Sequence, residues 1–192
     1  MKKHGMLVLL CLLLVLTGCS GQTEAEPFQY EEIADIFDLT ETDMQQMYGK
    51  PDEVMEDVLY GVDYRQYIFG ENRFAFYNYE NSAMQLCEAA VADARISCAR
   101  DIQLGDSLKD IRQKYPDAGS KAFLPLEGYQ NGTVKAEYRL LYGEYAYMSD
   151  YGIEVEAEDG TEWLVYSNEG VTLRYYFKDA SLARVEYILQ VF

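Results

Sequence analysis

One short pattern occurs twice in this chain of 192 residues, and it constrains the fold more than any other feature. In each copy a Ser or Thr stands three residues before an Asp, at the start of a stripe of apolar residues with helical spacing. Such a sequence is typical of a capped helix N-terminus. The copies match at a constant offset of 67, so that Phe37, Thr40, Asp43, Met44 and Tyr48 correspond to Leu104, Ser107, Asp110, Ile111 and Tyr115. This recurrence in register indicates an internal duplication.

Segments with strand character follow each predicted helix. They are rich in Val, Ile, Tyr and Phe, they alternate with period two, and Gly and Asn bound them, as in an antiparallel meander. We therefore predict an α+β fold of two tandem modules, each a helix plus an antiparallel meander, with the helices packed on one sheet face. The expected strands are 61–69, 73–79 and 93–98 in the first copy, and 134–142, 153–158, 161–166, 171–177 and 182–187 in the second.

The strand expected at 153–158 alternates strictly between apolar and acidic residues. A tight turn at Asp159-Gly160 follows it, and the pattern places Glu154, Glu156 and Glu158 together on one face. These carboxylates suggest calcium, but the sequence contains no Asp-x-Asp-x-Asp-Gly loop. We therefore expect a solvated strand face without a metal.

The N-terminus has the layout of a secretory signal. Lys2 and Lys3 precede an apolar run over 6–16, which is too short to span a bilayer, and the sequence Leu16-Thr17-Gly18-Cys19 follows. This ending resembles the lipobox of bacterial lipoproteins. The resemblance implies acyl chains on Cys19 and cleavage before it, which anchor the protein on the extracytoplasmic face of a membrane. The organisation predicted is a signal at 1–18, a lipidated Cys and tether at 19–29, and modules at 30–100 and 101–192.

The composition of the chain that would remain after cleavage of the signal excludes several classes of function. The one histidine, His4, leaves with it, and 14 basic residues remain against 33 acidic ones, a formal charge of −19. This charge excludes nucleic acid as a partner, because phosphate binding requires clustered Lys and Arg. Catalysis by a histidine base is excluded as well, and neither a phosphate loop nor a metal-ligand spacing occurs. We assign no catalytic residue, no cofactor and no metal.

Two cysteines remain for the folded part. Cys87 and Cys98 lie eleven positions apart, in a chain predicted to leave the cytoplasm, where disulfides persist. They are a candidate disulfide, and two unpaired buried thiols are the alternative. No Cys-x-x-Cys occurs, which argues against redox or zinc chemistry.

The mature region also resembles, as a pattern, the tandem modules of the β-lactamase-inhibitor-protein fold and the single module of small lipoproteins of outer-membrane assembly. The resemblance implies binding through an aromatic sheet face rather than catalysis. Tyrosine, with 18 copies, suits such an interface.

We predict a lipid-anchored, non-catalytic binding or adaptor protein that engages a protein or envelope component. The alternatives are an inhibitor of a secreted or envelope enzyme and, third, a carboxylate-dependent hydrolase. The candidate partner-binding residues are Tyr64, Tyr67, Tyr77, Tyr175 and Tyr187.

Overall fold

The computed structural model describes residues 25–59, 61–78, 82–126 and 135–190. The predicted signal and the lipidation residue Cys19 lie outside the described residues, as do Tyr79 and Val134 at the ends of two expected strands. Among the described residues, no helix has the length and apolar character needed to cross a membrane.

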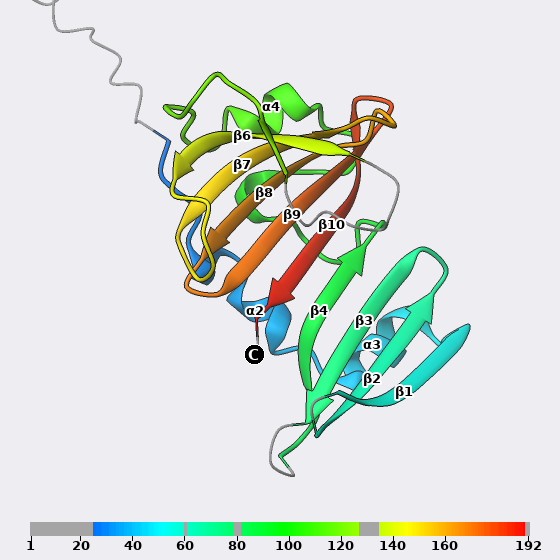
Figure 1. The fold of residues 1–192 in the computed structure, drawn as a ribbon. Helices are drawn as coiled ribbons and strands as arrows, with labels where there is room; N and C mark the ends of the chain where they lie inside the picture. The colour runs from blue at the N-terminus through cyan, green and yellow to red at the C-terminus, as the bar shows by residue number, and fades with distance from the viewer. Residues whose placement is uncertain (1–24, 60, 79–81, 127–134, 191–192) are drawn as a thin grey trace, which may run out of the picture.

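The described strands form one antiparallel sheet in the order β1-β2-β3-β4-β10-β9-β8-β7-β6-β5 (Figure 1). Each half of the chain runs back and forth as a meander, and the two halves meet where their last strands pair. The strands are β1 (Glu53–Leu59), β2 (Val62–Phe69), β3 (Asn72–Asn78), β4 (Gln85–Val91), β5 (Leu124–Pro125), β6 (Ala136–Gly143), β7 (Tyr151–Ala157), β8 (Glu162–Asn168), β9 (Val171–Lys178) and β10 (Ser181–Leu189).

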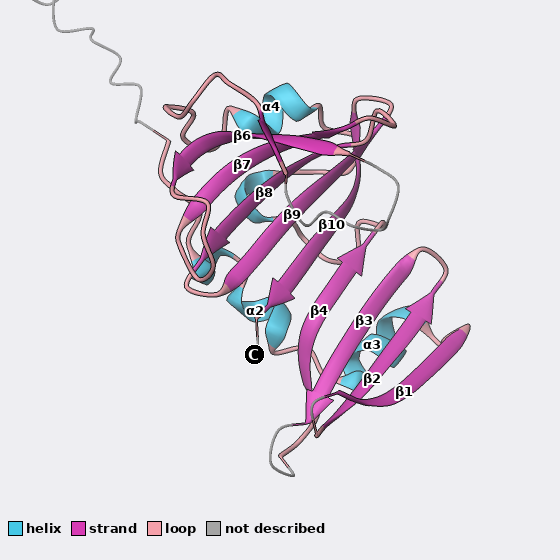
Figure 2. Cartoon of the chain, in the orientation of Figure 1, coloured by secondary structure: helices cyan, strands magenta, loops and turns pink. Residues whose placement is uncertain are grey.

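The pairing of β4 with β10 overturns the predicted fold class. Ala89 lies opposite Tyr187 and Val91 opposite Val185, so the hydrogen-bonded ladder continues from one half into the other. The prediction of an α+β fold with two tandem modules is therefore wrong, and the protein is a sheet-dominated chain with a single large sheet (Figure 2). The described helical segments are short: η1 (Tyr30–Glu32), α2 (Ala34–Phe37), α3 (Glu41–Tyr48), η2 (Ala99–Asp101) and α4 (Leu108–Arg112).

The local signals that began the predicted helices are confirmed. The Thr40 hydroxyl accepts a hydrogen bond from the Asp43 backbone N–H at 3.2 Å, and the Ser107 hydroxyl accepts one from Asp110 at 3.2 Å. Both helices then end early, because Gly49 with φ +82° follows α3 and the chain reaches Pro116 soon after α4. The second copy of the helix pattern thus yields only five residues of α-helix.

The expected strand at 93–98 is wrong, and the last strand of the first half is β4 instead. Asp93 turns the chain out of the sheet: its carboxylate accepts hydrogen bonds from the Arg95 backbone N–H at 2.9 Å and from the Asn72 side chain at 3.2 Å. A carboxylate that bonds to backbone two residues later is typical of a turn rather than a strand.

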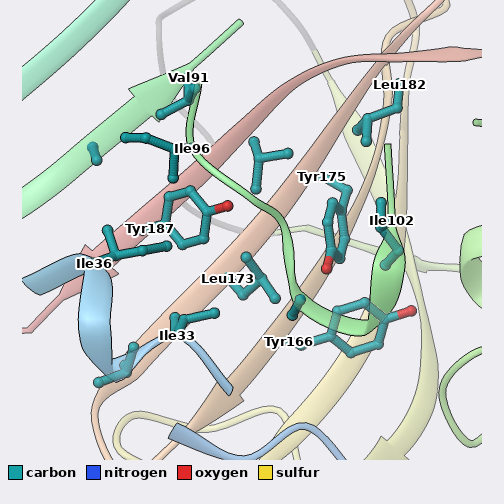
Figure 3. Packing of buried hydrophobic residues seen from close by; sticks show 14 of the residues in the cluster. Ile33, Ile36, Val91, Ile96, Ile102, Tyr166, Leu173, Tyr175, Leu182 and Tyr187 are labelled. Carbon is teal, nitrogen blue, oxygen red and sulfur yellow. The ribbon is translucent and has the colours of Figure 1, made fainter. Parts of the chain in front are cut away.

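One large core lies against one face of the sheet, which we call the core face. Figure 3 shows Tyr166, Leu173, Tyr175 and Tyr187 pointing from the strands toward the segments that cover this face. The short helices supply Ile36, Met44 and Ile111 to the same cluster, all of them buried. Burial of large aromatic side chains contributes more here than the few turns of helix do.

The N-terminal segment packs against the C-terminal half of the chain. The Phe28 backbone N–H donates to the Tyr142 hydroxyl at 3.1 Å, and the Tyr30 N–H donates to the Asn168 side chain at 2.9 Å. Phe28 itself is buried in the core. These contacts cross the predicted module boundary at residue 100 and join the two halves.

Candidate functional site

The sheet has a second face, opposite the core face, and it carries its own apolar cluster. Period-two alternation sends Leu173 and Tyr175 of β9 to the core face, and Thr172, Arg174 and Tyr176 between them to the second face. A separate cluster of buried residues lies on this face, and none of the described helical segments contributes to it. Its members are Ala136, Tyr151, Ile153, Val155, Trp163 and Val165.

A hollow of about 330 Å³ opens on this cluster, and we call it the aromatic pocket. Its floor comes from strands β7, β8, β9 and β10, and its rim comes from the segment after β6. Its volume lies at the small end of the range typical of ligand sites. The described lining residues are Leu126, Tyr145, Tyr151, Ile153, Val155, Trp163, Val165, Thr172, Arg174, Ile188 and Gln190.

Arg174 is the single charged residue among the described lining residues. Its guanidinium donates to one carboxylate oxygen of Glu186 at 2.8 Å, and Arg184 holds the other oxygen of Glu186 at 2.8 Å. Glu186 is buried and needs this pairing, because an unpaired buried carboxylate is costly. The result is a fixed hydrogen-bond donor in a hollow whose other polar lining residues are uncharged.

Aromatic rings extend from the pocket toward this ion pair. Trp163 and Tyr176 stack with centroids 6.0 Å apart and an interplanar angle of 12°, and the guanidinium of Arg184 lies 4.6 Å from the Tyr176 centroid. Stacked rings and a cation over a ring are each favourable by roughly 0.5–1.5 kcal/mol at partly exposed sites. The wall of the pocket is therefore held in place without a ligand.

The loop between β6 and β7 forms the rim. The Tyr145 ring lies 5.0 Å from Tyr151 in an edge-on arrangement and 4.9 Å from Tyr138. Burial raises the pKa of Tyr145 and of Tyr151, and the positive charge of Arg174 opposes this rise in both. Beyond Tyr145 the loop projects two more large side chains: Tyr147 is 72% exposed and Met148 is 49% exposed.

Three of the five tyrosines predicted to bind a partner are in the core, and their assignment is wrong. Tyr67, Tyr175 and Tyr187 are buried because the register of their strands directs them to the core face. Tyr67 donates to Glu41 at 2.7 Å, and the hydroxyls of Tyr115 and Tyr175 share a hydrogen bond of 2.9 Å. These tyrosines pack in the hydrophobic core, so a partner does not reach them in the folded protein.

Tyr64 and Tyr77 remain partly exposed. They lie directly opposite each other on β2 and β3, in the half of the sheet away from the aromatic pocket. The structure therefore separates the five predicted tyrosines into a buried group and this one cross-strand pair.

Cys87 and Cys98 are both free thiols, which contradicts the candidate disulfide and agrees with the alternative of unpaired cysteines. Cys87 occupies a bulge of β4, where its thiol donates to the Ala75 carbonyl at 3.3 Å, and burial raises its pKa to about 12. Burial also raises the pKa of Cys98, which lies beside Tyr187. Each thiol is thus engaged with a different neighbour.

The expectation of a wholly solvated acidic face on β7 is wrong for Glu154. This residue is 5% exposed, and its carboxylate accepts hydrogen bonds from Arg139 at 2.5 Å and from Arg112 at 3.0 Å. Asp117 extends the network by pairing with Arg139 at 2.9 Å. Glu156 and Glu158 are exposed, as expected. Within the described ranges, no three His, Cys, Asp or Glu side chains are grouped to hold a metal ion.

Sequence reasoning missed the polar members of the aromatic pocket. The pattern that could have revealed them lies in 171–177, where Thr172, Arg174 and Tyr176 alternate with apolar residues.

Comparison of the chain with models of protein families, with curated proteins and with solved structures finds no match.

Proposed function

We propose that this protein is a lipid-anchored, extracytoplasmic binding protein without catalytic activity, which holds a protein or envelope component through the second face of its sheet. The aromatic pocket supports this proposal: it is a hollow with aromatic and aliphatic side chains, the polar residues Thr172 and Gln190, and an oriented guanidinium donor, Arg174. Such a site suits an apolar group that carries a hydrogen-bond acceptor or a negative charge. No described lining residue is acidic, so the pocket offers nothing to the hydrolase alternative, which needs two facing carboxyl groups.

The chain's one tryptophan provides a direct test of the pocket. Trp163 lines it, so a bound probe should change the emission of that residue. Anilinonaphthalene sulfonate has an apolar ring system and an anionic acceptor, and we expect it to bind saturably with energy transfer from Trp163. Arg174→Met and Tyr145→Ala should each weaken binding about fivefold or more, because they remove the donor and the rim.

The matched control is Tyr64→Ala, which alters the same face of the sheet outside the pocket. It should leave the affinity for the probe unchanged. The same three variants should then be compared in affinity capture from an envelope extract. Loss of a specific partner with Tyr145→Ala and its retention with Tyr64→Ala would support the proposal. Unsaturable dye binding, or equal capture by all variants, would contradict it.

The loop between β6 and β7 favours inhibition of an enzyme as a second candidate function. Tyr147 and Met148 project from this loop next to the pocket, as an inhibitory element would. A secreted or envelope hydrolase assayed with the purified protein should lose activity, and deletion of the Tyr147 and Met148 side chains by alanine substitution should restore it.

The membrane anchor is proposed on the lipobox sequence, and mass measurement tests it. A mature protein that begins at Cys19 and carries the added mass of acyl chains would support the anchor. An N-terminus other than Cys19, or an unmodified Cys19, would reject it.

A further inference from the structure

Strand β1 is an open edge of the sheet. It pairs with β2 and with no other described strand, whereas at the opposite edge β5 is only two residues long. Edge strands in soluble proteins are usually short, bulged or covered, because their free N–H and C=O groups can pair with another chain. β1 is a regular strand of seven residues, Glu53 to Leu59, so its edge can accept a further strand.

The exposed side chains of β1 are unusual for a soluble surface. Val54, Met55 and Val58 have exposed fractions of 45%, 42% and 62%, and they account for three of the seven large apolar side chains exposed in the described part of the chain. An apolar group gathered on one free edge indicates a surface that another chain covers.

The acidic side chains of β1 indicate which charge the covering partner chain should carry. Glu53, Glu56 and Asp57 are acidic. Beside them lies a hollow of about 480 Å³, whose lining includes Glu56, Asp57, Asp63 and Tyr64. Arg65 occupies one side of this hollow and pairs with Glu56 at 2.7 Å and with Glu41 at 2.9 Å. Glu53, Asp57 and Asp63 form no ion pair with any described residue, so the local charge is negative.

We propose that β1 takes up an extended segment of a partner protein as an additional strand, and that this segment places Lys or Arg residues opposite the acids of β1 and apolar residues opposite Val54, Met55 and Val58. Backbone pairing supplies affinity, contacts to Val54, Met55 and Val58 bury apolar surface, and the basic side chains lie opposite Glu53, Glu56 and Asp57. A second copy of this chain is a poor occupant, because it would bring three further acids against this edge in a protein that already has a net charge of −17.

The experiment uses the mature protein in detergent and a fluorescein-labelled peptide, Val-Lys-Lys-Leu-Val-Lys, which is complementary to residues 58 to 53 in antiparallel order. We expect saturable binding by fluorescence anisotropy that weakens as salt is raised. Asp57→Lys should weaken the affinity about tenfold, because it replaces attraction by repulsion. Val58→Ser should weaken it as well, because it removes the most exposed apolar side chain of β1 without changing the charge.

Two controls make the result specific. Glu158→Lys makes the same kind of charge reversal at an exposed position after β7, and it should change the affinity little. A peptide with Glu in place of each Lys should not bind. Circular dichroism and Trp163 emission verify that every variant is folded.

Amide hydrogen exchange identifies the mode of binding. Strand addition should slow exchange of amides in β1, whereas binding of lysine side chains in the hollow alone should not. Equal affinity in Asp57→Lys and Glu158→Lys, absence of peptide binding, unprotected β1 amides, or self-association of the protein through β1 would each overturn the proposal. Tyr145→Ala should leave peptide binding intact, since the two sites share no described lining residue, so either proposal can fail without the other.

Discussion

Arg100 and Glu32 form a two-point ion pair in which both hydrogen bonds measure 2.6 Å. The same guanidinium donates to the backbone carbonyls of Glu26, Pro27 and Lys114, and it lies 4.1 Å from the centroid of the Tyr115 ring. Arg100 itself has a left-handed backbone with φ 56°, which is unfavourable for a residue with a Cβ. One side chain thus ties the N-terminal segment to the C-terminal half.

Replacement of Arg100 should therefore destabilise the whole fold. Lysine keeps the charge but cannot make the two-point contact, so we expect Arg100→Lys to lower the free energy of unfolding by about 2 kcal/mol. Urea denaturation measures this change. Arg95→Lys is the matched control, since the Arg95 side chain is 54% exposed, and it should cost less than about 1 kcal/mol. Equal losses in the two variants would contradict the role given to Arg100.

Tyr166 and Tyr175 should respond in opposite ways to loss of their hydroxyls. Both are fully buried, but within the described residues only the Tyr175 hydroxyl has a hydrogen-bond partner, that of Tyr115. Tyr166→Phe removes an unsatisfied polar group and should leave stability unchanged or raise it by up to about 1 kcal/mol. Tyr175→Phe should lower it by about 1 kcal/mol or more, because it leaves Tyr115 without that bond. Thermal unfolding of both variants checks the difference.

Stability should fall steeply at alkaline pH. Burial raises the pKa of Tyr142 to about 12, and it raises the pKa of Tyr115, Tyr166, Tyr175 and Tyr187 as well. An unfolded tyrosine ionises near pH 10, so above this value the unfolded state loses protons that the folded state retains. The stabilisation is complete below about pH 10 and is lost as pH rises toward the folded-state values.

The measurement is tyrosinate absorbance after a jump in pH. Exposed tyrosines should ionise at once, and the buried group should ionise only at the rate of unfolding seen by circular dichroism. If all tyrosines ionised while the protein kept its native spectrum, the burial argument would fail.

The thiol of Cys87 should be inert in the folded protein. With a pKa of about 12, roughly one molecule in ten thousand carries the reactive thiolate at pH 8. In a variant that carries Cys19→Ser and lacks residues 1–18, and with them Cys11, we expect slow labelling by a thiol reagent, and two equivalents of label once urea is added. An intact mass that shows the loss of two hydrogens would instead demonstrate a disulfide between Cys87 and Cys98.

The features that sequence predicted best depend on neighbouring residues. The bonds from Asp43 and Asp110 to Thr40 and Ser107 join residues three positions apart, and alternation identified β2, β3, β8, β9 and β10. β1 and β4 were missed because their sequences, EVMEDVL and QLCEAAV, do not alternate cleanly and contain acids or alanines that are uncommon in strands.

The features that sequence could not predict depend on pairing between distant segments. Nothing local indicates that Ala89 meets Tyr187, yet this contact turns two meanders into one sheet. Tyrosine occurs on both faces of the strands, so composition did not distinguish buried Tyr175 from half-exposed Tyr176. The aromatic pocket likewise joins Leu126 to Ile188 across most of the C-terminal half.

The start of the described chain and the free edge strand β1 lie at opposite ends of the sheet. The described chain begins beside β6 and β7, and β1 lies at the far end of the sheet (Figure 1). Strands about 4.8 Å apart make a sheet of ten strands roughly 43 Å wide. For a chain with the proposed anchor at Cys19, the free edge β1 therefore lies on the side of the sheet farthest from the start of the described chain.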